Sequence, residues 1–149
     1  MKTIELGDLK NHVGEDLGES APREITQQRV DLFADATDDH QWIHVDPERA
    51  KTGPFGGTIA HGYLTLALVP SLLKECLAIT GTSLGVNYGL NRLRFPAPVP
   101  VGRSIRLAAR LADVKEIDQG YQVVVGFEVK SDGQPKPSAV GEAVYNYYS

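Results

Sequence analysis

The chain has 149 residues, of which 42% are hydrophobic and 23% are charged, and we expect one soluble domain spanning residues 1–149. Its formal net charge of −4 argues against nucleic-acid binding, which requires a basic face. A lone cysteine, Cys76, has no partner for an internal disulfide, and its apolar neighbours predict a place in the core. The first residues lack the apolar segment of a signal peptide and no apolar run could span a bilayer, so we expect a cytoplasmic protein without membrane contact.

The first half of the chain has the pattern of short helices and loops. A helix is predicted from Asp8 to Val13. Thr26 is a suitable N-cap for a second helix, which should end near residues 37–39, where short polar side chains compete for the backbone. Asp46 and Pro47 are residue types favoured at an N-cap and at the first helical position, so a third helix should follow them.

A long apolar stretch predicts a buried central helix from about Gly62 to Leu77. Its apolar residues cover nearly every face, which is typical of a helix that is buried on nearly every side. Pro70 lacks a backbone N–H and should kink the helix. The preceding loop, Gly53–Gly57, lacks the Lys and Ser/Thr of a phosphate-binding loop. Gly57 is a candidate for lining a substrate pocket, although the loop could equally be only a connection.

The second half has the period of two that is typical of strands. Apolar residues alternate with polar or small ones over residues 105–111 and 121–129, and a last strand is predicted over residues 138–148. The turn sequences 118–120 and 131–133 separate these runs, which indicates an antiparallel meander. One buried helix and one antiparallel sheet together predict an α+β fold in which the sheet wraps around the helix. Pairing with a second copy would cover the exposed sheet edges.

The residues most suited to chemistry are Asp39, His44 and the start of the central helix at Gly62. A carboxylate and an imidazole held beside one water can take a proton from it and deliver one to carbon. The start of a helix offers free backbone N–H groups and a positive dipole end to a developing oxyanion. Glycine there lets a thioester carbonyl approach the backbone. Addition of water to an enoyl thioester needs both functions.

Four segments resemble the MaoC-like dehydratases, a family that includes the (R)-specific enoyl-CoA hydratases. The resemblance is closest to the branch of the nodulation-protein-N-like and mycobacterial 3-hydroxyacyl-thioester dehydratases. The specific part of the pattern is Asp-x4-His, here Asp39 and His44, followed by His61-Gly62. The segments that carry it are Phe33–Ala50, Gly53–Gly56, Ile59–Gly62 and Asn87–Val99.

The resemblance implies a single hot-dog fold that acts as a homodimer, with no metal or redox cofactor. The family's catalytic pair corresponds to Asp39 and His44, and its oxyanion-hole amide to Gly62. The implied reaction is (R)-specific hydration of a trans-2-enoyl-CoA or acyl-carrier-protein thioester, or the reverse dehydration, through one water. Which side chain takes the proton from water stays open. The chain has Gln41-Trp42 where many members have Asn-Pro, and Pro70 where some hydratases have serine, so pocket shape and chain-length preference stay open too.

Several further residues are candidates for substrate contact. Trp42 and Tyr88 could line an acyl pocket, although aromatic residues are also ordinary core components. Arg94, with Arg92 or Arg103, could meet the phosphates of coenzyme A, since guanidinium suits phosphate, but a purely surface role is the alternative. His61 could support the catalytic pair or simply pack at the start of the helix, and the structural role is favoured.

Three alternative functions remain at this stage. The side chains of His40, His44, His61 and Asp39 could bind zinc, since imidazole and carboxylate suit that ion, although we expect no metal. A hot-dog thioesterase would share the fold and the thioester substrate and would release a free acid. A non-catalytic acyl-thioester-binding partner subunit is the third, and an intact Asp39–His44 pair argues against it.

Overall fold

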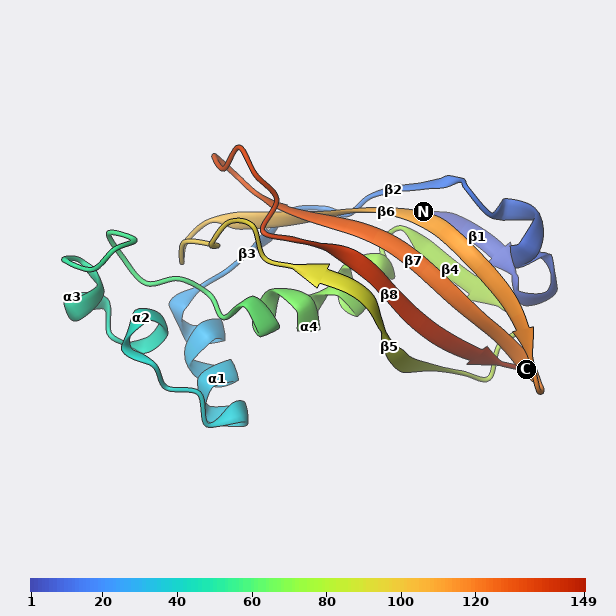
Figure 1. Cartoon of the computed structure of the whole chain (residues 1–149), viewed down its shortest axis with the longest axis horizontal. Helices are drawn as coiled ribbons and strands as arrows, with labels where there is room; N and C mark the ends of the chain where they lie inside the picture. The colour runs from blue at the N-terminus through green and yellow to red at the C-terminus, as the bar shows by residue number, and fades with distance from the viewer.

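The computed structural model describes all 149 residues (Figure 1). Short helices occupy much of the first half and long strands the second half. In chain order the elements are β1 (Lys2–Glu5), the 3-10 helix η1 (Leu6–His12), β2 (Asp16–Glu19), β3 (Arg23–Glu24), α1 (Gln27–Thr37), α2 (Trp42–Val45), α3 (Pro47–Ala50), α4 (Gly62–Leu73), β4 (Leu77–Thr80), β5 (Leu84–Arg94), β6 (Ser104–Ile117), β7 (Gly120–Ser131) and β8 (Ala139–Tyr148).

A six-stranded antiparallel sheet forms one wall of the molecule. Its strand order is β2-β6-β7-β8-β5, and β3 also pairs with β6. The sheet curves over α4, which lies along its inner face (Figure 1). A separate two-stranded parallel pair, β1 and β4, lies near the far end of α4. The predicted wrapping of an antiparallel sheet around the central helix is therefore confirmed.

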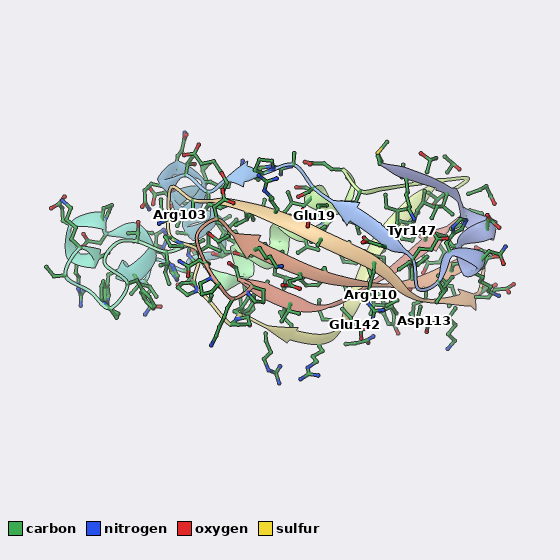
Figure 2. The ribbon with its side chains drawn as sticks, turned by 90° about the horizontal axis from the view of Figure 1, so that it is seen from above. Glu19, Arg103, Arg110, Asp113, Glu142 and Tyr147 are labelled. Carbon is green, nitrogen blue, oxygen red and sulfur yellow. The ribbon has the colours of Figure 1, made fainter.

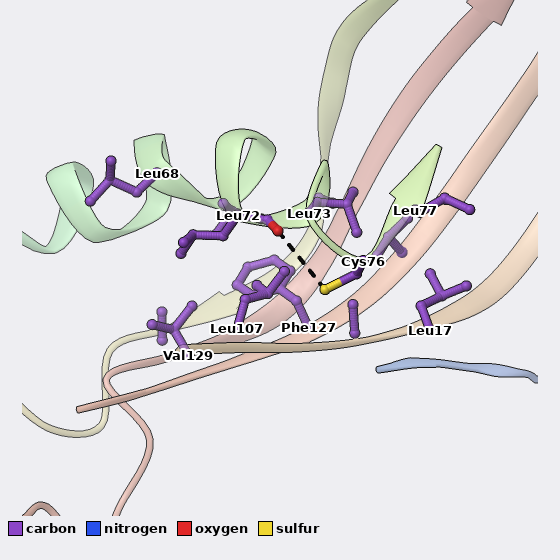
Figure 3. Packing of buried hydrophobic residues seen from close by; sticks show 14 of the residues in the cluster. Leu17, Leu68, Leu72, Leu73, Cys76, Leu77, Leu107, Phe127 and Val129 are labelled. Atoms are coloured by element: carbon purple, nitrogen blue, oxygen red, sulfur yellow. Dashed lines mark hydrogen bonds between the residues drawn. The ribbon is translucent and has the colours of Figure 1, made fainter. Parts of the chain in front are cut away.

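The core lies between the sheet and α4. Leu107 of β6, Phe127 and Val129 of β7 and Leu72 of α4 are buried against one another (Figure 3). Cys76 belongs to the same cluster, and its Sγ lies 3.9 Å from the Leu72 carbonyl oxygen, as the apolar surroundings predicted. Burial alternates along β6 and β7, so the period of two in the sequence corresponds to one packed face.

The helical arm, which we define as residues 26–57, extends beyond one end of the sheet (Figure 1). Thr26 is the N-cap of α1 and accepts a hydrogen bond from the Arg29 amide at 3.1 Å. Asp46 is the N-cap of α3, with Pro47 at its first position. Both predicted helix starts are confirmed, as is the end of α1 at Thr37.

Three predictions about elements were wrong. The first helix is a 3-10 helix that begins at Leu6, because the carboxylate of Glu5, not of Asp8, accepts the bond from the first turn. Strands β1–β3 were missed. The central helix ends at Leu73, since the next residues turn and Leu77–Thr80 pair with β1. None of the helices is long and apolar enough to cross a membrane.

The central helix is buried on most of its surface, and one stripe of it is exposed. Tyr63, Ala67 and Ser71, spaced one turn apart, form an uncovered stripe on α4. Tyr63 and Ala67 line an open groove of about 420 Å³ that runs between α4 and β5, whereas the Ser71 hydroxyl accepts a hydrogen bond from Arg23. An apolar pattern on all faces indicates that something covers each face, but it does not distinguish the same chain from a ligand or a second copy.

Candidate active site

Asp39 lies in the turn between α1 and α2, with an exposed side chain. Helix α1 ends at Asp38, which has the left-handed conformation (φ 58°) and reverses the chain. The Asp39 backbone carbonyl accepts a hydrogen bond from Nε2 of His61 at 3.0 Å. This bond connects the turn to the start of α4, so that the Asp39 carboxylate lies beside two histidine rings.

His44 is on α2 and is buried, with 7% of its surface exposed. Its Nδ1 lies 2.7 Å from the Ile59 carbonyl oxygen. Because a carbonyl only accepts, Nδ1 carries the proton, and Nε2 of the neutral ring keeps a free lone pair. The Ile59 amide in turn donates to the Ile43 carbonyl at 3.0 Å. Two hydrogen bonds, one from the His44 side chain and one to the Ile43 backbone, therefore join α2 to the segment before α4.

Gln27, in the first turn of α1, connects these segments to the rest of the arm. Its Nε2 donates to the His44 carbonyl at 2.7 Å, and its Oε1 accepts from the Thr58 hydroxyl at 2.6 Å. Gln27 was not among the residues predicted from the sequence. A glutamine at the start of a helix is ordinary, and no local pattern indicates that its amide joins two distant segments.

His61 packs between two rings at the centre of the site. Its ring is stacked on His44, with centroids 3.9 Å apart and planes 24° apart. Phe33 of α1 lies on it at 4.9 Å with a tilt of 57°. One polar atom each from Asp39, His44 and His61 lie within 4.8 Å of one another. The structure thus brings together three residues that are well separated in the sequence.

The pKa of His44 is lowered, first because burial disfavours the charged ring. The hydrogen bond to Ile59 acts in the opposite direction, His61 lowers the pKa further, and Asp39 raises it. The net effect favours a neutral ring, so Nε2 is available as a proton acceptor next to the Asp39 carboxylate.

The stacking argues against joint metal binding by the two histidines. An imidazole nitrogen coordinates a metal in the plane of its own ring. Two rings at 3.9 Å with planes only 24° apart keep their in-plane lone pairs in separate, nearly parallel planes, although one ligand atom from each lies within 4.8 Å of the other. In this arrangement His44 and His61 suit a proton-transfer site better than a shared ion.

Gly62 is the first residue of α4, with His61 as an N-cap that makes no side-chain cap bond. The first intrahelical bonds start at Leu64 and Thr65, both to the His61 carbonyl, which leaves the Gly62 amide free at the positive end of the helix. A Cβ on Gly62 would lie 3.0 Å from the Phe95 ring. A larger residue at position 62 would therefore need the Phe95 ring to move by a few tenths of an ångström, a contact that was not predicted from the sequence.

The groove between α4 and β5 begins beside Gly62. The Tyr63 ring meets the Phe95 ring edge-on with centroids 6.0 Å apart. The lining is mainly apolar and comes from α4, β5 and β8, and it includes Tyr63, Leu66, Pro70, Tyr88, Leu90 and Tyr145. Tyr88, predicted as a pocket residue, therefore lines this groove.

The other predicted substrate residues lie elsewhere. The Trp42 ring packs under the Arg49 guanidinium at 4.3 Å and against Gly53. Gly57 is half-buried immediately before Thr58, with no atom within 4 Å of a Cβ placed there. Arg94 lines a different hollow, described next.

A larger hollow of about 760 Å³ lies on the outer face of the sheet. Arg92, Arg94, Arg110 and Glu142 are among the residues that line it, whereas Asp39, His44 and His61 are not. Arg110 and Glu142 project from β6 and β8 over Gly126 of β7, and Figure 2 shows both on this face. Its mixed charges are ordinary for the solvated face of an antiparallel sheet. Asp39, His44 and His61 line neither this hollow nor the smaller groove, and the link to the groove is Gly62, which immediately precedes the groove residue Tyr63.

The comparisons with known proteins identify a family. The MaoC like domain matches residues 8–132. The chain is 50% identical over 149 residues, 99% of each sequence, to 3-hydroxyacyl-thioester dehydratase Z of Mycobacterium tuberculosis. It is 47% identical over 146 residues to nodulation protein N of Rhizobium leguminosarum bv. viciae, covering 93% of this chain and 89% of that protein.

The fold has relatives among solved structures. An unliganded (R)-hydratase from Pseudomonas aeruginosa has a TM-score of 0.74 and 26% identity, over 92% of this chain and 82% of that one. The hot-dog fold that the sequence resemblance implied is therefore confirmed. The chain belongs to the MaoC-like dehydratase family.

Proposed function

We propose that this protein adds water to a trans-2-enoyl thioester to give an (R)-3-hydroxyacyl thioester, or catalyses the reverse dehydration. The observation that carries the proposal is the arrangement of the Asp39 carboxylate and the free Nε2 of His44 beside one another at the start of α4. The name of the mycobacterial relative agrees with the dehydration direction. Concentrations of substrate and product set the direction, since an enzyme accelerates both.

The proposed mechanism uses one water held by the pair. Nε2 of His44 takes a proton from this water while the Asp39 carboxylate accepts its other hydrogen. The oxygen bonds to C3, and the double-bond electrons move onto the thioester oxygen, where the Gly62 amide stabilises the developing charge. The proton then passes from His44 to C2 on the same face. The roles differ because His44 is buried with Nδ1 already engaged, whereas Asp39 is exposed.

The thioester itself is the substrate, and the proposed steps need no metal or redox cofactor. We place the acyl chain in the groove between α4 and β5, whose volume of about 420 Å³ lies in the usual range for small-molecule sites. Coenzyme A and acyl carrier protein both present such a thioester. A series of enoyl-CoA lengths measured against the matching acyl-carrier-protein substrates would identify the carrier and the preferred length.

We also propose that a second copy covers β5. This strand is at the edge of the sheet, and Val86, Tyr88 and Leu90 on it are 46%, 65% and 42% exposed. An exposed apolar edge strand is a template for pairing with another chain. Analytical ultracentrifugation should find a dimer for the natural protein and a monomer for Val86→Lys. A monomeric natural protein would contradict the proposal.

The test of the reaction is the purified protein with crotonyl-CoA. We expect loss of the enoyl absorbance without release of thiol, and a product that chiral chromatography identifies as the (R)-3-hydroxy compound. Thiol release would instead indicate a thioesterase. Tight acyl-CoA binding without turnover at any chain length would indicate a non-catalytic binding subunit.

A further inference from the structure

We propose that His61 is a positioning residue that acts on both members of the catalytic pair through two separable parts of its ring. Its Nε2–H group holds the main chain of Asp39, and the face of its ring holds His44. The inference rests on the proposed function, because it assigns His61 to the reaction of Asp39 and His44. It goes beyond the start-of-helix packing role that the sequence alone favoured.

The first part is the hydrogen bond to Asp39. The turn of residues 38–41 lies at the surface, and the Asp39 side chain is exposed. The bond from His61 Nε2 to the Asp39 carbonyl, at 3.0 Å, ties this turn to a residue that is itself only 2% exposed. The buried His61 therefore fixes the backbone position from which the exposed Asp39 side chain extends.

The bond also determines the tautomer of His61. A carbonyl accepts only, so Nε2 carries the proton and Nδ1 of the neutral ring carries a lone pair. Nδ1 is buried and has no hydrogen-bond partner. The ring is therefore held by one hydrogen bond through Nε2 and by packing on its faces, and it serves as a fixed support.

The second part is the stack. His44 lies on one face of the His61 ring at 3.9 Å, and Phe33 supports it at 4.9 Å. This packing limits rotation of the His44 ring and keeps Nδ1 directed at the Ile59 carbonyl, 2.7 Å away. It also covers a face of His44 that water would otherwise reach, which favours the uncharged form.

The charged surroundings of His44 are few. Asp39, in the α1–α2 turn, and His61, before α4, are the titratable groups that act on it. Helix α1 contributes the neutral Gln27, which bonds the His44 carbonyl, and Asp31 contacts the amide of Gln27. Burial and the bond to Ile59 are the first influences on the His44 pKa, and the stacked His61 ring supplies part of that burial.

Two variants separate the parts of the ring. His61→Phe keeps a flat ring for the stack and loses the donor to Asp39. His61→Gln keeps an amide donor near the Nε2 position and loses the ring. His12→Gln is the matched control, because His12 is on η1 with Asp8 and Glu15 as its partners and takes no part in the site.

For His61→Phe we expect kcat for crotonyl-CoA to fall roughly ten- to a hundredfold, since misplacement of a reacting group by a small distance has this scale. KM should change little, and the midpoint of the His44 titration, followed by NMR of the labelled ring, should stay close to that of the natural protein. For His61→Gln the His44 midpoint should rise, and the acid limb of kcat/KM should move upward with it, while kcat above that limb falls less than in the Phe variant.

Two results would overturn the proposal and leave His61 as a packing residue only. One is an equal change of kcat and of the His44 midpoint in both variants. The other is an unchanged His44 titration in His61→Gln. If a His61 variant does not fold, Phe33→Leu removes only the supporting ring. It should raise the His44 midpoint by a smaller amount, and no movement there counts equally against the stack. An inactive natural protein refutes the proposed function, whereas the NMR titrations still test the two roles of the ring.

Discussion

The helical arm and the β6–β8 sheet are built on different principles. The sheet buries alternate apolar side chains against α4. Each strand is therefore held by packing contacts with many buried apolar residues. The site depends on single polar contacts: one amide of Gln27, one hydroxyl of Thr58 and one ring nitrogen of His61. We therefore expect substitutions in the sheet to change stability more than rate, and those at the site to change rate more than stability.

The largest effect on rate should come from the proposed pair. Asp39→Asn and His44→Ala should each lower turnover on crotonyl-CoA by at least roughly a hundredfold, the usual scale for acid/base groups. Asp39 is exposed, so its variant should unfold at nearly the same denaturant concentration as the natural protein. Asp35→Asn, an exposed carboxylate on α1 that pairs with His40, is the matched control. Near-normal hydration by either variant of the pair would refute the assignment.

The largest effect on stability should come from the sheet. Leu107 is fully buried on β6, and Leu107→Ala should lower the free energy of unfolding by about 2–5 kcal/mol through lost burial and a residual cavity. Turnover per folded molecule should change only slightly. Urea unfolding with Arg106→Ala, an exposed residue on the same strand, as control measures the difference. A loss of turnover comparable to that of Asp39→Asn would remove the distinction between the two regions.

The same distinction explains what could be predicted from the sequence. The N-caps Thr26 and Asp46 and the alternation in β6 and β7 are local signals, and the structure follows them. The end of α4 at Leu73 depends on a strand pairing between residues 77–80 and 2–5, which no local pattern shows. Strands β2 and β3 are short and are fixed only by pairing with the distant β6.

The candidate site divides in the same way. Asp39, His44 and Gly62 could be identified because their spacing is specific, and the structure brings the three regions together. Gln27 and Phe95 could not be found, since their roles come from contacts with residues far along the chain. Arg94 was placed on residue type alone, and it lines the outer face of the sheet instead of the groove.

A smaller effect on rate is expected from the support around the pair. Gln27→Leu keeps the size of the side chain but leaves the His44 carbonyl and the Thr58 hydroxyl without their partner. Stability should fall by about 1–3 kcal/mol, the cost of an unsatisfied buried polar group. We expect kcat to fall roughly tenfold, because His44 shifts without being removed. Gln28, the next residue, is exposed, so Gln28→Leu is the control. An equal loss of stability and of kcat in the two variants would show that Gln27 has no special role.

The smallest effect is a displacement of the pH profile. Burial lowers the pKa of His44, so the neutral ring that accepts a proton persists to a lower pH than it would for an exposed histidine. The acid limb of kcat/KM should therefore lie below the ordinary histidine value of about 6.5.

The lowered pKa of His44 also affects stability. The unfolded chain binds the proton more readily than the folded one, so this group destabilises the fold as the pH drops through the ordinary value. His44→Asn should remove this pH dependence of kcat/KM and this pH dependence of stability together. An acid limb at or above the ordinary value would contradict the prediction. It would mean that the helical arm leaves His44 accessible to water, unlike the interior beneath the sheet.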